Sequence, residues 1–565
     1  MPRRVTRKPR QSHPGSAPKP PSEGPRKAAP PKLSVLAAGG VGALALALAI
    51  YLLRLDPVLG QYQDDAWYTV LAKALATGQG YTLISAPVQG IGAWIYPPVY
   101  PGLLSLAWRL WPEFPQNVWL LKSISVAAMF GVGLACFHYF RHIRGTSLAV
   151  AAGIALATTL NPAFVFLATS TLMSECVFTL GQLLTIISIE RALQPGGTRP
   201  TWVYLVLGGL LASLTWLTRA IGASLTIGIV LYLLKQRLIR RAMIPAAVAA
   251  SVVLPWALYA VQRAPTEEQR LQQASYIVAT GRETFWQRQA GNADSGQITA
   301  RELPQRVWDN AVSVLTHDLG VMVLAPLPYW EKGGEMTAEG VSSSQASRVL
   351  SLLVSILAIA GFLSVVRTRV TLSEIVVVIS LGVILIFPWT PFRYLLPLLP
   401  FVVFYLLMGV RVCYGWFQRM SGPQTAWTVP GIVVGCFVAL NLYANTAYIL
   451  RKYSDVPAER PEWIRAFVEH QALFQWIRDN IPAGQTLLSA NAPQLYLYTG
   501  LKTMPAGNAA LRRDILAQNH VRYLVQMGMP KPPDVNAAEE KFDAPYRSNT
   551  AMNLRVVDLG DRFSR

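Results

Sequence analysis

Two adjacent carboxylates, Asp64 and Asp65, follow the first long apolar segment and open the stretch Asp64-Asp65-Ala66-Trp67-Tyr68. Burying a carboxylate is costly unless it is paired, so acidic residues in this place more often have a function. A carboxylate near a membrane surface can act as a general base that removes the proton from a hydroxyl group. An aspartate here can instead cap the helix that follows it. Proton transfer and helix capping are the two interpretations of this pair.

Three further ionisable residues, Glu175, Arg219 and Arg393, lie at the ends of apolar segments. Such residues are often anchors whose charged heads reach the membrane surface. When the apolar segments are threaded alternately through a membrane, all three fall on the same side as Asp64. Two or three acids and two arginines on one side are harder to explain by anchoring than any one of them. We therefore expect these residues to converge on one face.

Membrane helices must position these residues. The chain has 565 residues, of which 52% are hydrophobic and 14% charged, a balance typical of a polytopic membrane protein. Crossing a hydrocarbon core of about 30 Å takes about 20 apolar residues. Apolar runs lie near 33–53, 118–140, 147–168, 172–190, 202–218, 220–235, 242–261, 348–366, 371–389, 394–411 and 428–449. We predict about eleven transmembrane helices.

The orientation follows from the Lys and Arg residues in short loops, which favour the cytoplasmic side. The tail before the first run and the loops near 141–144, 235–241 and 367–369 are basic and fall on one side. Residues 1–32 are predicted to be a disordered basic cytoplasmic tail, because they have almost no apolar residues to bury. The net charge of +20 is then mainly a topology signal, and no nucleic-acid partner is predicted.

Three parts of the chain are predicted to lie outside the membrane and outside the cytoplasm. They are a first external loop over 54–117, a long external loop over 262–347 and a C-terminal domain over 450–565. Both loops belong to the predicted membrane domain, which covers residues 33–449. The C-terminal domain is predicted to be a small α/β domain, with helices near 461–480 and 508–519 and strands at 486–490, 521–526 and 554–559. The four cysteines lie in or beside predicted spans and support neither a disulfide framework nor a zinc motif.

The loop Gln61 to Tyr68, the segment Tyr96-Pro97-Pro98-Val99-Tyr100-Pro101, the Ser174-Glu175 pair and Arg393 with its flanking prolines resemble the GT-C glycosyltransferases. The resemblance is specifically to the branch that contains protein O-mannosyltransferases and lipid A aminoarabinose transferases. It implies a GT-C type membrane fold of α-helices. The segment Ser489 to Gly500 is similar to a stretch in the C-terminal domains of bacterial members.

The resemblance also implies roles for the residues. The first acidic residue of the loop motif is the proposed catalytic residue of the family, and it corresponds to Asp64. The second is usually Glu, and here it is Asp65. Arg393 with Arg219 would hold a lipid phosphate, because a guanidinium can bind phosphate through paired hydrogen bonds. Asp65 and Glu175 would position donor or acceptor.

The proline-rich segment that contains Tyr96 and Tyr100 is predicted to form a rigid turn near the site, since proline restricts its own backbone and that of the preceding residue. Either tyrosine could stack on a sugar, or simply belong to a turn that enters an interfacial helix. Relatives differ in their dependence on metals, so a divalent metal is possible and no other cofactor is predicted.

The sequence therefore predicts a glycosyltransferase of the bacterial plasma membrane. It would move a sugar from a polyprenyl-phosphate donor to a lipid, glycan or protein acceptor outside the cytoplasm, with Asp64 as general base. One alternative is a non-enzymatic transporter of polyprenyl lipids or sugars, which would be expected to show repeated halves and polar residues at mid-membrane depth. Another is an inactive scaffold that keeps the GT-C fold.

Overall fold

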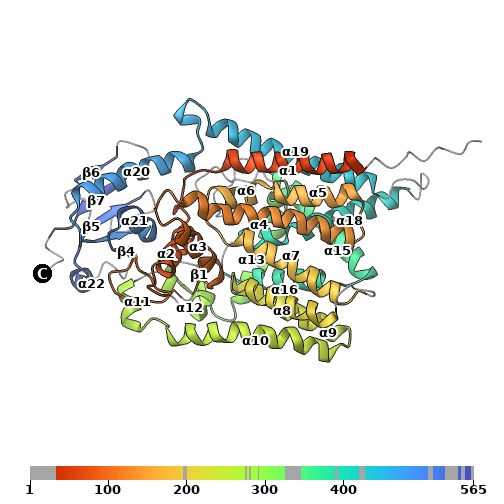
Figure 1. The fold of residues 1–565 in the computed structure, drawn as a ribbon, viewed down its shortest axis with the longest axis horizontal. Helices are drawn as coiled ribbons and strands as arrows, with labels where there is room; N and C mark the ends of the chain where they lie inside the picture. The colour runs from red at the N-terminus through yellow and green to blue at the C-terminus, as the bar shows by residue number, and fades with distance from the viewer. Residues whose placement is uncertain are drawn as a thin grey trace, which may run out of the picture. The chain divides into compact units, whose positions relative to one another are not determined.

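The apolar runs fold as helices, because backbone polar groups in a lipid core must be satisfied within the segment itself. The computed structural model describes residues 33–93, 95–194, 200–273, 276–278, 281–289, 292–324, 345–388, 392–418, 427–506, 513–527, 545–548 and 554–560. Each of the predicted runs coincides with a helix or a broken helix (Figure 1). These helices are α1 (Leu33–Arg54), α4 (Val118–His138), α5 (Leu148–Thr159), α6 (Pro162–Thr169), α7 (Glu175–Ala192), α8 (Thr201–Trp216), α9 (Ala223–Lys235), α10 (Ile239–Gln262), α15 (Gln345–Thr368), α16 (Leu372–Ile386), α17 (Phe392–Leu395), α18 (Leu399–Gln418) and α19 (Thr428–Lys452).

Not every one of these helices is long enough to span a membrane. Among the described residues, five helices are long and apolar enough, or six if the bent pair α5 and α6 is one span. That pair is bent by 46°, where the Asn161 side chain caps α6 and Pro162 lacks the N–H that would continue α5. The run 147–168 is thus not one straight helix. The predicted number of eleven spans stays a prediction.

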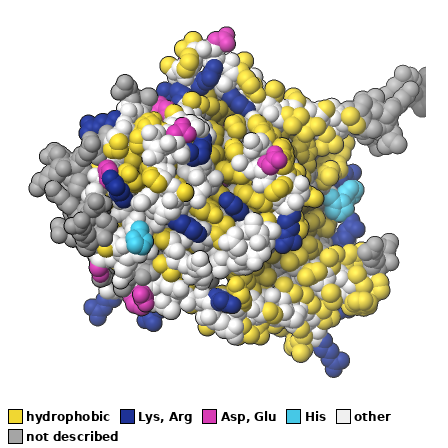
Figure 2. Space-filling model, turned by 60° about the vertical axis from the view of Figure 1, so that its left-hand side comes forward, with side chains coloured by type: hydrophobic (Ala, Val, Ile, Leu, Met, Phe, Trp, Pro, Cys, Tyr) yellow, Lys and Arg dark blue, Asp and Glu magenta, His cyan; other side chains and the backbone are white. Residues whose placement is uncertain are grey.

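Large apolar side chains are exposed along several of these helices. Leu210 on α8, Leu258 on α10 and Leu353 on α15 are examples. Figure 2 shows hydrophobic side chains predominating on the right-hand, helical part of the visible face, where charged side chains are sparse. Exposed apolar bands of this extent are stable against lipid and not against water. The chain is therefore a helical membrane protein.

The orientation in the membrane is a prediction that labelling can check. In a background in which the exposed Cys413 and Cys436 are replaced by serine, a cysteine at Gly500 should react with a membrane-impermeant maleimide in intact cells. A cysteine at Gly196, which lies outside the described residues, should be protected. The reverse pattern would overturn both the orientation and the external location of the site.

The chain forms two compact units, residues 1–48 and residues 49–565. Of the first unit, residues 33–48 are described and form the beginning of α1, whereas the predicted disordered tail over 1–32 lies outside the described residues. Residues 450–565 belong to the second unit together with the remaining helices. The predicted domain boundaries stay predictions.

The predicted C-terminal sheet is present. Within the described residues it has five strands in the order β4-β3-β5-β7-β6, in which β3 runs parallel to β4 and β5 while β7 runs antiparallel to β5 and β6. Leu488 of β3 lies between Met504 and Leu524, which share its buried core. The elements are α20 (Glu462–Asn480), β3 (Thr486–Ser489), α21 (Ala492–Thr499), β4 (Thr503–Pro505), α22 (Arg513–Gln518), β5 (Val521–Gln526), β6 (Tyr546–Arg547) and β7 (Arg555–Asp558). The elements α21, β4 and β6 were not predicted from the sequence.

The external loops contain short elements. In the first loop, α2 (Asp64–Ala76) packs against α3 (Val99–Leu110) and against α21 of the C-terminal region. In the long loop, a β1–β2 hairpin lies between short helices. Its elements are α11 (Glu267–Gln273), α12 (Gly281–Trp286), β1 (Gln287–Gln289), β2 (Asn292–Gln297), α13 (Leu303–Ser313) and α14 (Leu319–Leu324).

Candidate active site

Asp64 is the first residue of α2, and its carboxylate makes two strong contacts. The Tyr96 hydroxyl donates a hydrogen bond to Oδ1 over 2.6 Å, and Arg393 Nη2 lies 2.7 Å from Oδ2. The residue that caps α2 is Gln63, whose side chain makes no capping hydrogen bond. Asp64 is therefore not the residue that caps α2, which was the alternative interpretation from the sequence. Its carboxylate faces a guanidinium and a phenol instead.

Arg393 bridges two carboxylates from distant parts of the chain. Its Nη2 pairs with Asp64, and its Nε lies 3.0 Å from Oε1 of Glu175. The Arg393 side chain is 14% exposed and that of Asp64 is 17% exposed, whereas Glu175 is fully buried. The planar guanidinium can donate in two directions at once, which a lysine ammonium cannot do with the same geometry.

The Arg393 segment is held against α7 by a polar contact. Gln182 Nε2 of α7 donates a hydrogen bond of 2.9 Å to the carbonyl of Pro397, in the short 3₁₀ turn Leu396–Leu398 between α17 and α18. Since Glu175 begins α7, this bond ties the segment that carries Arg393 to the helix that carries its second partner.

Arg219 completes an alternating row of charges. Its Nη1 lies 2.9 Å from Oε1 of Glu175 and donates a hydrogen bond of 3.0 Å to the Ser174 hydroxyl. Arg219 precedes the short 3₁₀ helix Ala220–Gly222 between α8 and α9. The structure thus brings together the Asp64, Arg393, Glu175 and Arg219 side chains, two negative and two positive.

Aromatic side chains border this row. The guanidinium carbons of Arg219 and Arg393 lie 5.1 Å and 5.8 Å from the ring centre of Tyr394. The Tyr68 ring lies 4.7 Å from the Tyr96 ring, and its hydroxyl is 3.1 Å from the Ser174 hydroxyl. The Tyr68 ring was not singled out in the sequence, although it lies one helical turn after Asp64 and so shares its face of α2.

Tyr100 is the second residue of α3. Its side chain is fully buried, its hydroxyl lies 3.2 Å from that of Ser125, and the Tyr68 ring meets it edge to face. A sugar cannot stack on a ring that has no exposed face. Tyr100 therefore supports Tyr68 in this structure, whereas Tyr96 reaches the carboxylate of Asp64.

Asp65 is fully buried and is directed into its own loop. Its carboxylate accepts hydrogen bonds from the backbone N–H groups of Gly60, Tyr62 and Ala66 at 2.8, 3.1 and 3.0 Å. Burial raises the pKa of Asp65 to about 6, while the N–H groups of Gly60 and Ala66 act in the opposite direction. The three N–H donors favour the ionised form of this carboxylate.

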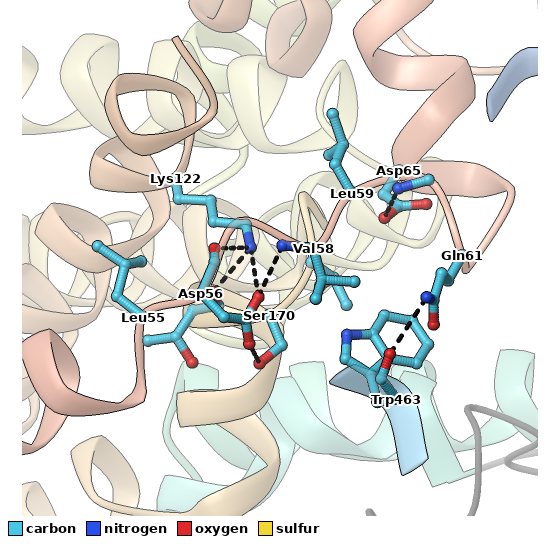
Figure 3. A network of polar contacts seen from close by, with 12 residues as sticks. Leu55, Asp56, Val58, Leu59, Gln61, Asp65, Lys122, Ser170 and Trp463 are labelled. Atoms are coloured by element: carbon cyan, nitrogen blue, oxygen red, sulfur yellow. Dashed lines mark hydrogen bonds and ion pairs between the residues drawn. The ribbon is translucent and has the colours of Figure 1, made fainter. Parts of the chain in front are cut away.

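A buried ion pair that the sequence analysis missed holds the beginning of this loop. Lys122 Nζ of α4 lies 3.0 Å from Oδ1 of Asp56 (Figure 3). It also donates hydrogen bonds to the carbonyls of Asp56 and Thr169. The Ser170 hydroxyl donates to Oδ2 of Asp56 over 2.6 Å. A lysine inside the apolar run 118–140 was the available signal, because such a charge needs a partner.

The described residues contain no group of three or more His, Cys, Asp or Glu side chains that could hold a metal ion. Asp64 and Glu175 are the two carboxylates of the row, and Arg393 lies between them.

No protein-family model and no curated protein matches the sequence. Solved structures do match. ArnT from Cupriavidus metallidurans, a lipid A aminoarabinose transferase, superimposes over 94% of this chain and 99% of its own with a TM-score of 0.55 and 14% identity, both in the apo state and bound to undecaprenyl phosphate. The Archaeoglobus fulgidus oligosaccharyltransferase in complex with Zn and sulfate superimposes over 92% of this chain and 73% of its own, with a TM-score of 0.52 and 14% identity. At such identities the likeness concerns the fold, and it confirms the prediction of a GT-C type architecture.

Proposed function

From the GT-C fold and the row of charges that it carries, we propose that the protein is a membrane glycosyltransferase. It moves a sugar from a polyprenyl-phosphate donor to a hydroxyl acceptor outside the cytoplasm. The observation that carries this proposal is the contact of Asp64 with Arg393, which in turn contacts Glu175. A base and a phosphate-binding cation must both lie near the same anomeric carbon for this reaction, because the base receives the proton of the attacking hydroxyl on one side of that carbon and the cation binds the phosphate that leaves on the other.

In the proposed reaction, Asp64 accepts the proton of the acceptor hydroxyl as its oxygen attacks the anomeric carbon of the sugar. The bond between that carbon and the phosphate oxygen breaks, and its electron pair leaves with polyprenyl phosphate. Attack from the side opposite to the phosphate inverts the anomeric centre. Negative charge develops on the leaving phosphate, where a fixed guanidinium stabilises it most.

The Arg393 guanidinium has enough N–H groups to contact the two carboxylates and a phosphate of the sugar donor. A guanidinium carries five N–H groups, and the contacts with Asp64 and Glu175 use Nη2 and Nε. A phosphate that binds Arg393 competes with Asp64 for the same positive charge.

The choice of a lipid donor has independent support. The described residues include helices able to cross a membrane, and the row of charges lies at helix ends: Asp64 and Glu175 begin α2 and α7, and Arg219 follows α8. ArnT, a protein with this fold, has been solved with undecaprenyl phosphate bound. A transporter would instead be expected to place its ionisable residues at mid-membrane depth. We assign the protein to the bacterial plasma membrane, with Asp64 and the C-terminal region outside the cytoplasm.

Mass spectrometry of cell-envelope lipids, glycans and glycoproteins in a deletion strain tests the proposed function. We expect at least one species to lose the mass of a single sugar residue, and a plasmid with the wild-type gene to restore it. A plasmid with Asp64→Asn should not restore it. Restoration by Asp64→Asn would contradict the role of Asp64 as the base, and an unchanged envelope in the deletion strain would contradict the proposed reaction.

A further inference from the structure

Five consecutive residues immediately before Asp64 all contact the C-terminal region. The side-chain amide of Asn491 donates a hydrogen bond of 2.8 Å to the carbonyl of Gly60, and that of Gln494 donates one of 3.0 Å to the carbonyl of Leu59. The other three contacts are Gln61 Nε2 to the Trp463 carbonyl at 3.2 Å, the Tyr62 ring to the Trp463 ring at 5.3 Å, and Gln63 Nε2 to the Ala490 carbonyl at 3.1 Å. Figure 3 shows the bond between Gln61 and Trp463 beside Asp65.

Asn491 is the residue directly before α21, and Gln494 lies in the first turn of that helix, both within the segment Ser489 to Gly500 whose resemblance was noted from the sequence. Both side chains are buried, and the Asn491 amide also donates to Oε1 of Gln494 over 2.9 Å. This bond sets the direction of both amides, since the Nδ2 group of Asn491 faces two acceptors. Buried amides held in this way form a rigid surface against which the loop rests.

The backbone of the loop is strained next to Asp64. Gln63 has a φ of +58°, which non-glycine residues seldom adopt, and Gly60 has a φ of +91°. A Cβ atom at position 60 would lie 2.6 Å from Cγ of Gln494, so only glycine allows this close approach. Strained backbone of this kind persists only where the surroundings hold it. Here the C-terminal region supplies the contacts.

The contacts lead from the C-terminal region to Asp64 in two steps. Asn491 holds the carbonyl of Gly60, and the N–H of Gly60 donates to Oδ2 of Asp65 over 2.8 Å. The N–H of Tyr62 donates to the other carboxylate oxygen of Asp65. Asp65 thereby closes the loop onto the first turn of α2, and Asp64 is the residue directly before it.

We propose that the C-terminal region is part of the catalytic apparatus, with Asn491 as the positioning residue that holds the Asp64 carboxylate against Arg393. Gln494 and the carbonyl of Ala490 support it. Asn491 does not touch the reacting atoms. It acts through the backbone of residues 59–63 and the carboxylate of Asp65. The catalytic consequence depends on the proposed glycosyl transfer, whereas the positioning itself does not.

Hydrogen–deuterium exchange of the full-length protein in nanodiscs tests the positioning without any assay of activity. In Asn491→Ala we expect the amides of a peptide covering residues 59–68 to exchange on the order of tenfold faster than in the wild type, because the hydrogen bonds within the loop open more often. Asn480→Ala is the matched control. Its side chain is exposed and bonds only to its own helix, at the carbonyl of Trp476. Unchanged exchange in Asn491→Ala would overturn the inference, whether or not the protein transfers a sugar.

Steady-state kinetics with a polyprenyl-phosphate sugar tests the consequence for the reaction. We expect Asn491→Ala to lower kcat by about 10- to 100-fold, since small displacements of a catalytic group cost that much, and to leave the KM for the donor within about twofold. A purely structural role would reduce the amount of folded protein and leave kcat per folded molecule unchanged. Wild-type kcat in folded Asn491→Ala would overturn the catalytic part of the inference.

Two further variants keep the test decisive if Asn491→Ala does not fold. Gln63→Met removes the bond to Ala490 from the side of the loop, where the side chain is only half-buried, and should lower kcat in the same way. Asp65→Asn combined with Asn491→Ala should be little slower than the worse single variant, because both residues position Asp64 through the same contacts at Gly60. Fully additive reductions of kcat in the double variant, or wild-type kcat in Gln63→Met, would contradict the positioning of Asp64 through this loop.

Discussion

Asp64→Asn is expected to abolish sugar transfer, with a loss of kcat of about 100- to 10,000-fold, the range that general bases contribute. Asparagine keeps the shape of the side chain and can still accept the hydrogen bond from Tyr96. It cannot take a proton, and its amide loses the charge that pairs with Arg393. Donor turnover by the purified protein in nanodiscs, measured together with the unfolding temperature, checks this result.

The controls for this prediction separate the two carboxylates. Tyr96→Phe removes the hydrogen bond to Asp64 and leaves a carboxylate that can take a proton, so it should slow the reaction far less than Asp64→Asn. Asp65→Asn should lower kcat through the loop and also destabilise it, because its carboxylate accepts three backbone N–H bonds. An inactive Asp65→Asn beside an active Asp64→Asn would move the base to Asp65. Full activity in Asp64→Asn would remove the assignment altogether.

Arg393→Lys is expected to lower kcat by about 100-fold and Arg393→Ala by about 1,000-fold. Losses of this size are typical when an enzyme loses a hydrogen-bond donor that stabilises charge developing in the transition state. The structure gives the reason for the difference. The guanidinium spans the distance from Asp64 to Glu175 with Nη2 and Nε, whereas a lysine has a single nitrogen and can serve one carboxylate well. In Arg393→Ala the fully buried Glu175 keeps only Arg219, and the unfolding temperature should also fall.

A membrane anchor would behave differently, and Arg367→Lys provides the comparison. Arg367 is exposed at the end of α15, where either basic residue can reach the membrane surface. That variant should turn over the donor at the wild-type rate. Donor affinity, measured by binding of a polyprenyl-phosphate sugar, should weaken in both Arg393 variants. Wild-type kinetics and affinity in Arg393→Lys would contradict a phosphate-binding role.

Local sequence signals were strongest for the helices. Each apolar run from 33–53 to 428–449 coincides with a helix or a broken helix, since length and hydropathy are enough to identify a segment that lipid can surround. The local sequence signals were weaker where a helix breaks. The bend at Asn161 and the 3₁₀ turn at Pro397 depend on how neighbouring helices satisfy the freed carbonyl groups, as Gln182 does for Pro397.

For the candidate site, residue types and helix ends were enough to select Asp64, Glu175, Arg219 and Arg393. Charged residues at the ends of apolar helices must either reach water or find partners, and the alternating threading places their helix ends on one side. The roles of these residues stay predictions. Which acid meets which base does not follow from the threading, because ion pairs of 2.7 to 3.0 Å depend on helix rotation and side-chain direction.

The amino-acid sequence alone was sufficient to predict a helical membrane protein, an acidic loop after the first helix and a small C-terminal sheet, since all three follow from local composition and periodicity. The tertiary structure decided the difference between two neighbouring aspartates. Asp64 and Asp65 are identical in chemistry, yet one faces Arg393 and the other faces the N–H groups of its own loop. Their directions follow from the backbone of residues 59–63, which is held by Asn491, Gln494 and Trp463. Contacts between residues some 400 positions apart in the chain leave no local pattern to read.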